Sequence, residues 1–472
     1  MRILMFSITP LFPDFDMGGA QKHLRRIALH MAESGHTVTL ICTRRDDTRA
    51  SFRWHPNAEV LPILRFKQPF PAPYDTGAHN LASIIQDVSE HLERADVFYM
   101  HDGEFLFPFV YQHKPTVIGL RDNVYPETMQ GMFHFSADRL IVVSEYTRQL
   151  VLCTAGRFYP ELPDRVRVIG NSFELAHYKP TAPGRILDLI RQSDPSFDPA
   201  RHTLLLHPHR PEPSKGLAES LAVLERLVHR YGCNNARLLV PRWLNADGDP
   251  GVRAFYEQAE SEIAARGLTE HVLFHPWVPV DLVPEYYSLG AMTLALGHFV
   301  ESFGNVSYES LACGTPAIRS RVSSDRDLLP DTLIDKVDYS DNDGAAAIAA
   351  DIVRTGRRTS DNTLAALRDR FDVRRQLDAY ADTITGARAA FALAFRALPL
   401  EDAQFRLPVW CYRSPTRGVY HDFRADYRRD PALLDLVDRH PMGFTFAQAQ
   451  AAGTARDQVE GWYHDGYLVP SA

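Results

Sequence analysis

The feature that most constrains the fold is a repeated alternation of short apolar strand patterns with amphipathic helix patterns. The run RILMFSI near the start is followed by a loop with two glycines. Residues 20–34 then place apolar side chains at helical spacing, and the next strand pattern is TVTLIC. Strands that alternate with helices in this way form a parallel sheet covered by helices on both faces, so we predict a doubly wound α/β fold.

The alternation occurs twice, which predicts two Rossmann-like domains over residues 1–180 and 181–385. A stretch with four prolines, residues 159–184, separates them. A long helical pattern over 372–396 then predicts a connecting helix over 386–400. The remaining strand patterns lie at 96–100, 116–120, 140–143, 204–206, 236–240, 272–274, 291–296 and 315–319, and the remaining helix patterns at 218–230, 255–266 and 306–312.

Residues 401–472 have a different pattern, in which three short helices and a closing strand follow an aromatic-rich segment. This order predicts a small winged-helix-like accessory module. Modules of this kind often bind DNA, but 10 acids against 8 arginines leave this one acidic, and the whole chain carries −8. Because phosphate contact needs clustered basic residues, we expect no nucleic-acid partner. We expect the module to contact a protein or a second copy of the chain, or to brace the other domains.

The five cysteines are widely spaced, and no pair has the spacing of a zinc or redox motif. We therefore expect reduced thiols in a cytoplasmic protein, either free or peripheral at a membrane. The N-terminal apolar run is too short for a signal peptide and lacks a small-residue cleavage site. No stretch approaches 18 uncharged apolar residues, so we expect no transmembrane segment.

The strongest local motif is LGHFVESFGNVSYESLACGTP, which carries two glutamates. Glu301 lies in a loop directly after a strand, Gly304 opens a helix, and Glu309 lies on that helix. The first N–H groups of the helix, near Asn305 and Val306, have no partner within it and favour an anion such as a diphosphate. Glutamates near helix N-termini are also common as simple capping residues, so the motif alone leaves both interpretations open.

A second motif, LLLHPHRPEPSKG, places Arg210 and Lys215 in a loop after a buried strand. Two cations at the carboxyl end of a parallel strand point to the crevice where such sheets bind ligands, and a diphosphate needs two charges neutralised. The alternative is a solvated loop with two unrelated cations. Lys215 is the more informative of the two, since the chain has only six lysines.

A third motif is the pair Gly18-Gly19 after the first strand. It could bind phosphate at the N-terminus of the following helix. It lacks the full dinucleotide-binding glycine pattern and the P-loop lysine, so an ordinary tight turn explains it equally well.

Together these segments resemble the family-4 (group 1) retaining glycosyltransferases of the GT-B fold, over about residues 1–396. The resemblance implies two facing Rossmann-like domains that close on each other. It implies a nucleoside-diphosphate sugar bound mainly by residues 185–385 and an acceptor hydroxyl bound mainly by 1–180. The segments that carry it are TPLFPDFDMGGAQKHLRRIALHMAESGHTVTLIC, LIVVSEYTRQLV with VRVIGNSFELAHYKP, HRPEPSKG, HVLFHPWVPVDLVPEYYSLGAM and ESFGNVSYESLACGTPAI.

The resemblance also implies a role for individual residues. Arg210 and Lys215 would hold the donor diphosphate, and Glu309 the ribose hydroxyls. Glu301 would contact the transferred sugar near its reacting face, and Trp277 would lie along the base. The implied donor-binding residues are Gly18, Gly19, Arg210, Lys215, Trp277, Val278, Phe303, Gly304, Asn305, Val306 and Glu309.

The chain departs from the family on the acceptor side. Many members carry a histidine after the strand that here is TVIGL, where this chain has Arg121 followed by Asp122 and Asn123. His101 follows the preceding strand instead. His101 could contact the sugar or be a loop histidine satisfied by the backbone, and Asp122 could assist the acceptor hydroxyl.

Members of the family usually need no bound metal, and the donor loops here contain no Asp-x-Asp motif. We therefore expect neither a metal nor a resident cofactor. The acceptor could be a glycan or lipid-linked glycan, a small metabolite or a peptide, and the sequence does not rank these.

Three other functions remain open. The chain could be a GT-B epimerase, or a phosphorylase that uses a cofactor lysine. It could also be a non-catalytic GT-B scaffold whose C-terminal module binds a protein or nucleic-acid partner. The presence of Glu301, Glu309, Arg210 and Lys215 favours an active enzyme over the scaffold.

Overall fold

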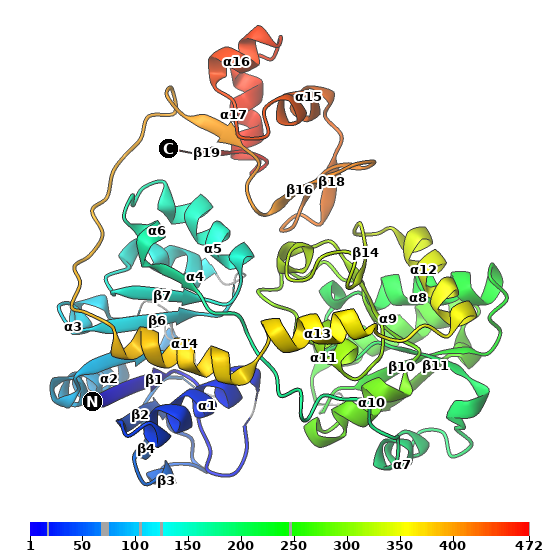
Figure 1. Ribbon diagram of the computed structural model, residues 1–472, viewed down its shortest axis with the longest axis horizontal. Coiled ribbons are helices and arrows are strands. Elements are labelled where there is room, and N and C mark those ends of the chain that lie inside the picture. The colour runs from blue at the N-terminus through cyan, green and yellow to red at the C-terminus, as the bar shows by residue number, and fades with distance from the viewer. Residues whose placement is uncertain (17, 68–74, 103–105, 123–125, 245–247, 472) are drawn as a thin grey trace. The chain divides into compact units, whose positions relative to one another are not determined.

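The chain forms two compact units (Figure 1). The N-terminal unit consists of Met1–Asn171, Val373–Cys411 and Arg429–Ala472, and the central unit of Ser172–Asp372 and Tyr412–Arg428. The computed structural model describes residues 1–471 apart from residues 17, 68–74, 103–105, 123–125 and 245–247.

The N-terminal unit is built on an eight-stranded sheet in the order β3-β4-β2-β1-β5-β6-β7-β8. Its neighbouring strands are parallel except β3 and β4, which form an antiparallel pair at one edge. The strand order reverses between β1 and β5, the place where open parallel sheets bind ligands beyond their carboxyl ends. The strands are β1 (Arg2–Ser7), β2 (Thr37–Thr43), β3 (Phe52–His55), β4 (Ala58–Leu64), β5 (Val97–Met100), β6 (Thr116–Leu120), β7 (Arg139–Val142) and β8 (Val166–Val168).

Helices cover both faces of this sheet, as predicted. In β1, Ile3 and Met5 pack with helix α1, and Leu4 and Phe6 pack with helix α2 on the other face. Helix α14 packs beside α1, with Tyr380 buried in the same core. Helix α14 falls within the predicted second domain, 181–385, but it groups with the N-terminal unit. The helices of this unit are α1 (Gly19–Glu33), α2 (Ala78–Arg94), α3 (Pro108–Tyr111), α4 (Pro126–Gly131), α5 (Glu145–Val151), α6 (Leu162–Arg165) and α14 (Val373–Thr385).

The central unit contains a six-stranded, fully parallel sheet in the order β11-β10-β9-β12-β13-β14. Its strand order reverses between β9 and β12. The strands are β9 (Thr203–Leu206), β10 (Ala236–Arg242), β11 (Val272–Pro276), β12 (Met292–Ala295), β13 (Ala317–Ser320) and β14 (Asp335–Val337). The helices are α7 (Arg185–Arg191), α8 (Leu217–His229), α9 (Pro250–Ala265), α10 (Val283–Leu289), α11 (Asn305–Ala312), α12 (Asn342–Thr355) and α13 (Asp361–Arg370).

The predicted connecting helix over 386–400 is wrong, because helix α14 ends at Thr385 and residues 386–400 contain no helix. This segment runs along one side of the N-terminal unit as an extended chain (Figure 1). Leu393 enters the core of the unit, and Arg165 and Arg157 donate hydrogen bonds to the carbonyl groups of Phe391 and Leu398. Contacts with the unit therefore override the local helix propensity.

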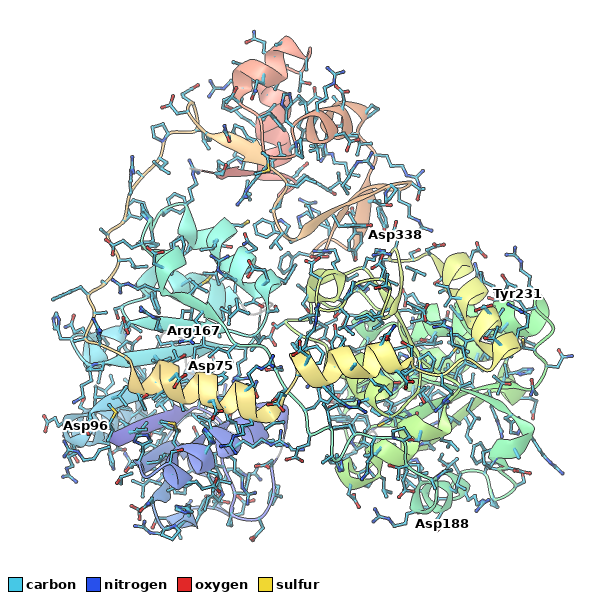
Figure 2. The ribbon with its side chains drawn as sticks, viewed as in Figure 1. Asp75, Asp96, Arg167, Asp188, Tyr231 and Asp338 are labelled. Atoms are coloured by element: carbon cyan, nitrogen blue, oxygen red, sulfur yellow. The ribbon has the colours of Figure 1, made fainter. Side chains whose placement is uncertain are left out.

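The C-terminal residues contain the three predicted short helices and two small sheets. Strand β15 pairs antiparallel with β19, and β16, β17 and β18 form a three-stranded sheet. We call residues 412–428 the C-terminal meander. It groups with the central unit, where Ser414 donates a hydrogen bond to Asp338, so residues 401–472 do not group as one module. Asp338 is labelled in Figure 2. The elements are β15 (Gln404–Arg406), β16 (Cys411–Ser414), β17 (Gly418–His421), β18 (Asp426–Arg428), α15 (Pro431–Arg439), α16 (Phe446–Ala451), α17 (Arg456–His464) and β19 (Val469–Ser471).

Among the residues that the structure describes, no helix has both the length and the apolar character needed to cross a membrane.

Candidate functional site

Two loops meet at the carboxyl edge of the central sheet, where its strand order reverses. One loop follows β9 and carries Arg210 and Lys215, and the other follows β12 and carries Glu301. Strands β9 and β12 are hydrogen-bonded neighbours, so both loops leave the sheet side by side. This is the predicted position for a ligand crevice in a sheet of this order.

The backbones of the two loops are in direct contact. The N–H groups of His298 and Phe299 both donate to the carbonyl oxygen of Ser214, at 2.9 and 3.0 Å. Gly216 has φ of +86° and lies against Gly297, and a Cβ on either glycine would overlap the backbone of the other loop. Only glycine at both positions allows this approach, which fixes Lys215 relative to the loop of Glu301.

Lys215 and Glu301 form a direct ion pair, with 2.7 Å between Nζ and Oε1. The Lys215 side chain is 10% exposed, and its ammonium group lies 3.5 Å from the centre of the Phe299 ring. Lys215 was predicted to hold the donor diphosphate and Glu301 to contact the transferred sugar, and the structure brings the two side chains into direct contact. An incoming phosphate could therefore compete with Glu301 for the ammonium group of Lys215.

Arg210 lies on the same loop and is exposed, and its guanidinium group pairs with Glu212 at 3.0 Å. Its predicted role therefore requires the side chain to exchange this local partner for a ligand. An exposed ion pair of this kind contributes little to stability, so breaking it to bind a ligand costs little free energy.

Helix α11 begins at Asn305, and its N-cap Gly304 makes no side-chain capping hydrogen bond. Gly304 has φ of +75°, and a Cβ there would lie 2.5 Å from a terminal nitrogen of Arg319. Arg319 was not among the predicted site residues. Its guanidinium group forms a buried ion pair with Asp325, an oxygen of which would lie 3.0 Å from the same Cβ, so the pair adds little net charge to a helix end whose own N–H groups favour anions.

The side chains around this helix start differ in exposure. Phe303 is buried against Tyr308 and Phe371, whereas Asn305 is exposed and Val306 is half-buried. Phe303 therefore anchors the loop, and the backbone at Asn305 and Val306 is the part that a ligand can reach.

Glu309 lies in the second turn of α11 and is half-buried. The hydroxyl group of Tyr287, on α10, donates to Oε2 of Glu309 at 3.5 Å. Burial, together with the charge of Glu309, holds the pKa of Tyr287 well above its usual value, so Tyr287 remains a hydrogen-bond donor. Tyr287 was not among the predicted site residues, although it lies in HVLFHPWVPVDLVPEYYSLGAM, one of the segments that carry the family resemblance.

Trp277 and Val278 follow the end of β11, the neighbour of β10. Val278 is buried, and the Trp277 ring packs edge to face against Trp243 at 4.8 Å between ring centres. Trp277 was predicted from the family resemblance alone. Trp243 was not predicted, although its place directly after the strand pattern of β10 is visible in the sequence. The two rings form an aromatic surface beside the charged loops, which suits a flat base.

Two histidines, the buried His207 and the half-buried His209, support the loop of Lys215. Nδ1 of His207 is hydrogen-bonded to the hydroxyl of Ser220, and Nε2 of His209 to the carbonyl group of Leu294. Burial, and secondarily the charge of Lys215, lowers the pKa of His209 to about 3. The folded protein therefore keeps this imidazole neutral at pH values where an unfolded chain would protonate it.

We expect the substitution His209→Gln to reduce the loss of stability in acid. An imidazole with a lowered folded-state pKa stabilises the protein fully above pH 6.5, and this contribution is lost as the pH falls towards 3. The slope is about 1.4 kcal/mol per pH unit for one proton, so the free energy of unfolding of the wild type should fall by about 2 kcal/mol more than that of the variant between pH 6.5 and 5. Urea unfolding at both pH values measures the difference, and equal slopes for the two proteins would contradict it.

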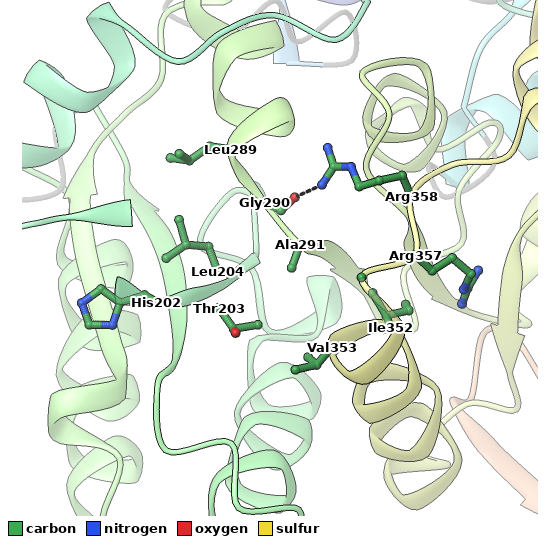
Figure 3. Close-up of a pocket in the computed structure, with 11 residues that line it drawn as sticks. His202, Thr203, Leu204, Leu289, Gly290, Ala291, Ile352, Val353, Arg357 and Arg358 are labelled. Atoms are coloured by element: carbon green, nitrogen blue, oxygen red, sulfur yellow. Dashed lines mark hydrogen bonds between the residues drawn. The ribbon is translucent and has the colours of Figure 1, made fainter. Parts of the chain in front are cut away.

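A separate pocket of about 290 Å³ lies at the opposite, amino edge of the same sheet (Figure 3). It is lined by Thr203 at the start of β9, by Gly290 and Ala291 before β12, and by Ile352 on α12. Arg358 donates a hydrogen bond to the carbonyl oxygen of Gly290 at 2.6 Å. None of the predicted site residues lines this pocket, so it is not the site of the carboxyl-edge loops.

In the N-terminal unit, Gly18 and Gly19 lie exposed at the start of α1. Gly18 has an extended backbone that any residue can adopt, and a Cβ on Gly19 would meet no atom within 4 Å. Helix α1 has no side-chain cap, so its first N–H groups have room for a ligand.

His101 is fully buried after β5, and both of its ring nitrogens are engaged. Nδ1 lies 2.8 Å from the Tyr99 hydroxyl, and Nε2 lies 2.9 Å from the carbonyl oxygen of Ala20. In this conformation His101 ties α1 to β5 and offers no free ring nitrogen to a sugar. Asp122 is half-buried, and Asn123 lies outside the described residues.

Asp102, next to His101, connects the loops after β1 and β5 and was not among the predicted site residues. Its carboxylate accepts hydrogen bonds from the backbone of Ile8 and from the hydroxyls of Ser7 and Thr9, at 2.6–2.7 Å. This contact fixes the loop at the carboxyl edge where the N-terminal sheet reverses its strand order.

Comparisons with known proteins agree with this architecture. Residues 17–177 match the family Glycosyltransferase Family 4, and residues 193–333 match Glycosyl transferases group 1. The D-inositol 3-phosphate glycosyltransferase of Acidothermus cellulolyticus is 32% identical over 192 residues, which are 40% of this chain and 39% of that protein. The enzyme of the same name from Saccharomonospora viridis is 28% identical over 264 residues, 54% of this chain and 57% of that protein. The matched segments thus span less than two thirds of the length of these relatives.

Solved structures show the same fold. The Anabaena protein Alr3699/HepE in complex with UDP has a TM-score of 0.62 at 19% identity, covering 82% of this chain and all of that chain. The sucrose-phosphate synthase of Thermosynechococcus elongatus has a TM-score of 0.61 at 16% identity, covering 82% of this chain and 98% of that chain. The two family matches together cover more than half of the chain, in the order in which its two Rossmann-like domains occur. The chain therefore belongs to the group 1 glycosyltransferases of the GT-B fold, a family of enzymes.

Proposed function

We propose that this protein is a retaining glycosyltransferase that moves a sugar from a nucleoside-diphosphate sugar to an acceptor hydroxyl. The observation that carries the proposal is the arrangement of side chains at the carboxyl edge of the central sheet, where its strand order reverses. There Lys215 pairs with Glu301 beside the uncapped start of α11, and Glu309 lies on that helix. These groups supply a cation, helix N–H donors and two carboxylates within one loop system.

Each part of this arrangement suits a different part of the donor. Lys215, Arg210 and the N-terminus of α11 hold the diphosphate and stabilise the charge that develops on it as the sugar departs. Glu309 accepts hydrogen bonds from the ribose hydroxyls, and Trp277 lies along the base. Once the donor phosphate has replaced Glu301 beside the ammonium group of Lys215, Glu301 contacts the transferred sugar.

Retention of configuration follows from attack of the acceptor on the face that the diphosphate leaves. In this mechanism the departing phosphate takes the proton of the acceptor hydroxyl. The reaction needs no resident metal or cofactor, and we place the protein in the cytoplasm. Support for a nucleotide-sugar donor comes from the related fold of Alr3699/HepE, which was solved with UDP.

The names of the curated relatives suggest an anionic polyol, D-inositol 3-phosphate, as the first acceptor to test. A pocket in the N-terminal unit supports this choice, because four arginines line it. It lies beyond the carboxyl ends of β2 and β4, and also contains two aspartates that pair with Arg45 and Arg49. The lining arginines are Arg44, Arg45, Arg49 and Arg65.

The proposal is tested by following sugar transfer by proton NMR. The protein is incubated with UDP-, GDP-, ADP- and dTDP-hexoses and with D-inositol 3-phosphate as acceptor. We expect release of one nucleoside diphosphate and a product whose anomeric configuration equals that of the donor. A product of inverted configuration would overturn retention. No release from any donor would favour the non-catalytic scaffold.

A further inference from the structure

The C-terminal meander lies outside both family matches, yet it packs on the segments that support the candidate donor site. Two contacts connect it to these segments. One is a buried ion pair to the turn after β13, and the other is a set of hydrogen bonds to the turn after β14.

The first contact centres on Asp422, whose side chain is fully buried. Its two carboxylate oxygens accept hydrogen bonds from both terminal nitrogens of Arg326, each at 2.8 Å. One of them also accepts from the backbone N–H of Ser323 at 3.2 Å. Ser323 has φ of +49°, a left-handed conformation that a serine rarely adopts. A surrounding contact must hold such a residue in place, and Asp422 supplies one.

The turn held by Asp422, Ser323–Arg326, also carries Asp325. Asp325 forms a buried ion pair with Arg319, and the Arg319 guanidinium group lies against Gly304 at the start of α11. A terminal nitrogen of Arg319 donates to the carbonyl oxygen of Gly304 at 3.4 Å. A continuous series of contacts therefore runs from the meander to the helix end where the donor phosphate is proposed to bind.

The second contact reaches the other side of the same site. Tyr427 and Arg417 of the meander both donate hydrogen bonds to the carbonyl oxygen of Tyr339, at 3.2 and 3.1 Å. The Tyr339 hydroxyl is in turn hydrogen-bonded to Nδ1 of His298 at 3.1 Å. His298 belongs to the loop that contacts Ser214 beside Lys215. The meander thus supports both the loop of Glu301 and the start of α11.

We propose that the C-terminal meander is a positioning element of the donor site, with Asp422 as the residue that holds the turn behind α11. The proposal rests on the proposed function, since it assigns the meander to the nucleotide-binding step. A buried ion pair is a poor source of stability, because apolar residues of the same size often stabilise a core equally well. The bidentate pair of Asp422 and Arg326 instead fixes the relative orientation of the two side chains, which suits a residue that positions the turn Ser323–Arg326.

The test compares Asp422→Asn with a matched control, Asp194→Asn. Asp194 also forms an ion pair in the central unit, at 2.9 Å from Arg237, but at the amino edge of the sheet away from the donor loops. For each variant we would measure the melting temperature, amide hydrogen exchange of residues 300–307, and the Kd of whichever of UDP, GDP, ADP and dTDP binds the wild type best.

We expect both variants to melt earlier, but only Asp422→Asn to raise the Kd, by about tenfold, and to accelerate exchange at 300–307. Wild-type Kd and exchange in folded Asp422→Asn would overturn the proposal, as would equal effects in the control. If the wild type binds none of the four nucleotides, the proposed function fails. Hydrogen exchange of residues 300–307 in Asp422→Asn then shows by itself whether the meander holds the start of α11 in place.

A second variant keeps the test decisive if Asp422→Asn does not fold. Arg326→Lys keeps the charge opposite Asp422 but removes the two-pronged hydrogen bond. We expect it to fold and to change the Kd and the exchange in the same direction, though less strongly. A folded Arg326→Lys variant with wild-type exchange at 300–307 would overturn the proposal.

Discussion

Replacing Lys215 with alanine should weaken the binding of the nucleoside diphosphate by about 10- to 150-fold, because one charge-assisted hydrogen bond contributes about 1.5–3 kcal/mol. The variant also leaves the half-buried Glu301 carboxylate without its partner, so its negative charge repels the incoming phosphate. We therefore expect sugar transfer to be lost. Calorimetric titration of the nucleotide gives the change in Kd.

Two further variants make this result specific. Lys179→Ala removes an exposed lysine of the same unit and should leave the Kd unchanged. The double variant Lys215→Ala/Glu301→Gln removes the unpaired carboxylate, so it should regain stability without regaining nucleotide binding. Wild-type affinity in Lys215→Ala would remove Lys215 from the donor site.

The second large effect is expected from Gly297→Ala. An added Cβ would overlap the carbonyl oxygen of Ser214 and approach the carbonyl carbon of Lys215 to 2.6 Å. Both are backbone atoms, so the two loops must separate instead of a side chain moving aside. We expect a loss of about 1–3 kcal/mol in the free energy of unfolding, together with loss of nucleotide binding.

The matched control for this substitution is Gly184→Ala. Gly184 lies in the same unit, and its Cβ would meet only the flexible Glu285 side chain at 3.8 Å. Urea unfolding and nucleotide titration of both variants show whether an effect comes from forcing the two loops apart or from replacing any glycine of the unit with alanine. Equal behaviour of the two variants would contradict the role assigned to the loop junction.

The sequence predicted the sheets and the site loops because both depend on local patterns. The strand patterns TVTLIC and TVIGL correspond to the observed strands β2 and β6, and the cationic loop follows β9 as expected. Glycines and charged residues directly after an apolar run are visible in one sequence, and parallel topology brings such loops to one edge.

The sequence could not predict contacts between residues far apart in the chain. Lys215 and Glu301 are 86 residues apart, and Arg326 and Asp422 are 96 apart, and no local period links either pair. The absence of the connecting helix has the same origin. Residues after Thr385 have a helical pattern, but packing of Leu393 into the N-terminal unit holds them extended.

The central claim is that the carboxyl-edge loops of the central unit bind a nucleoside-diphosphate sugar, and a thermal-shift panel tests it most directly. The panel contains UDP, GDP, ADP and dTDP and their sugars, each at saturating concentration. A ligand at one hundred times its Kd adds about 2.7 kcal/mol to stability, so we predict a clear rise in melting temperature with one base series. No rise with any of them would contradict the donor site and favour a non-catalytic scaffold.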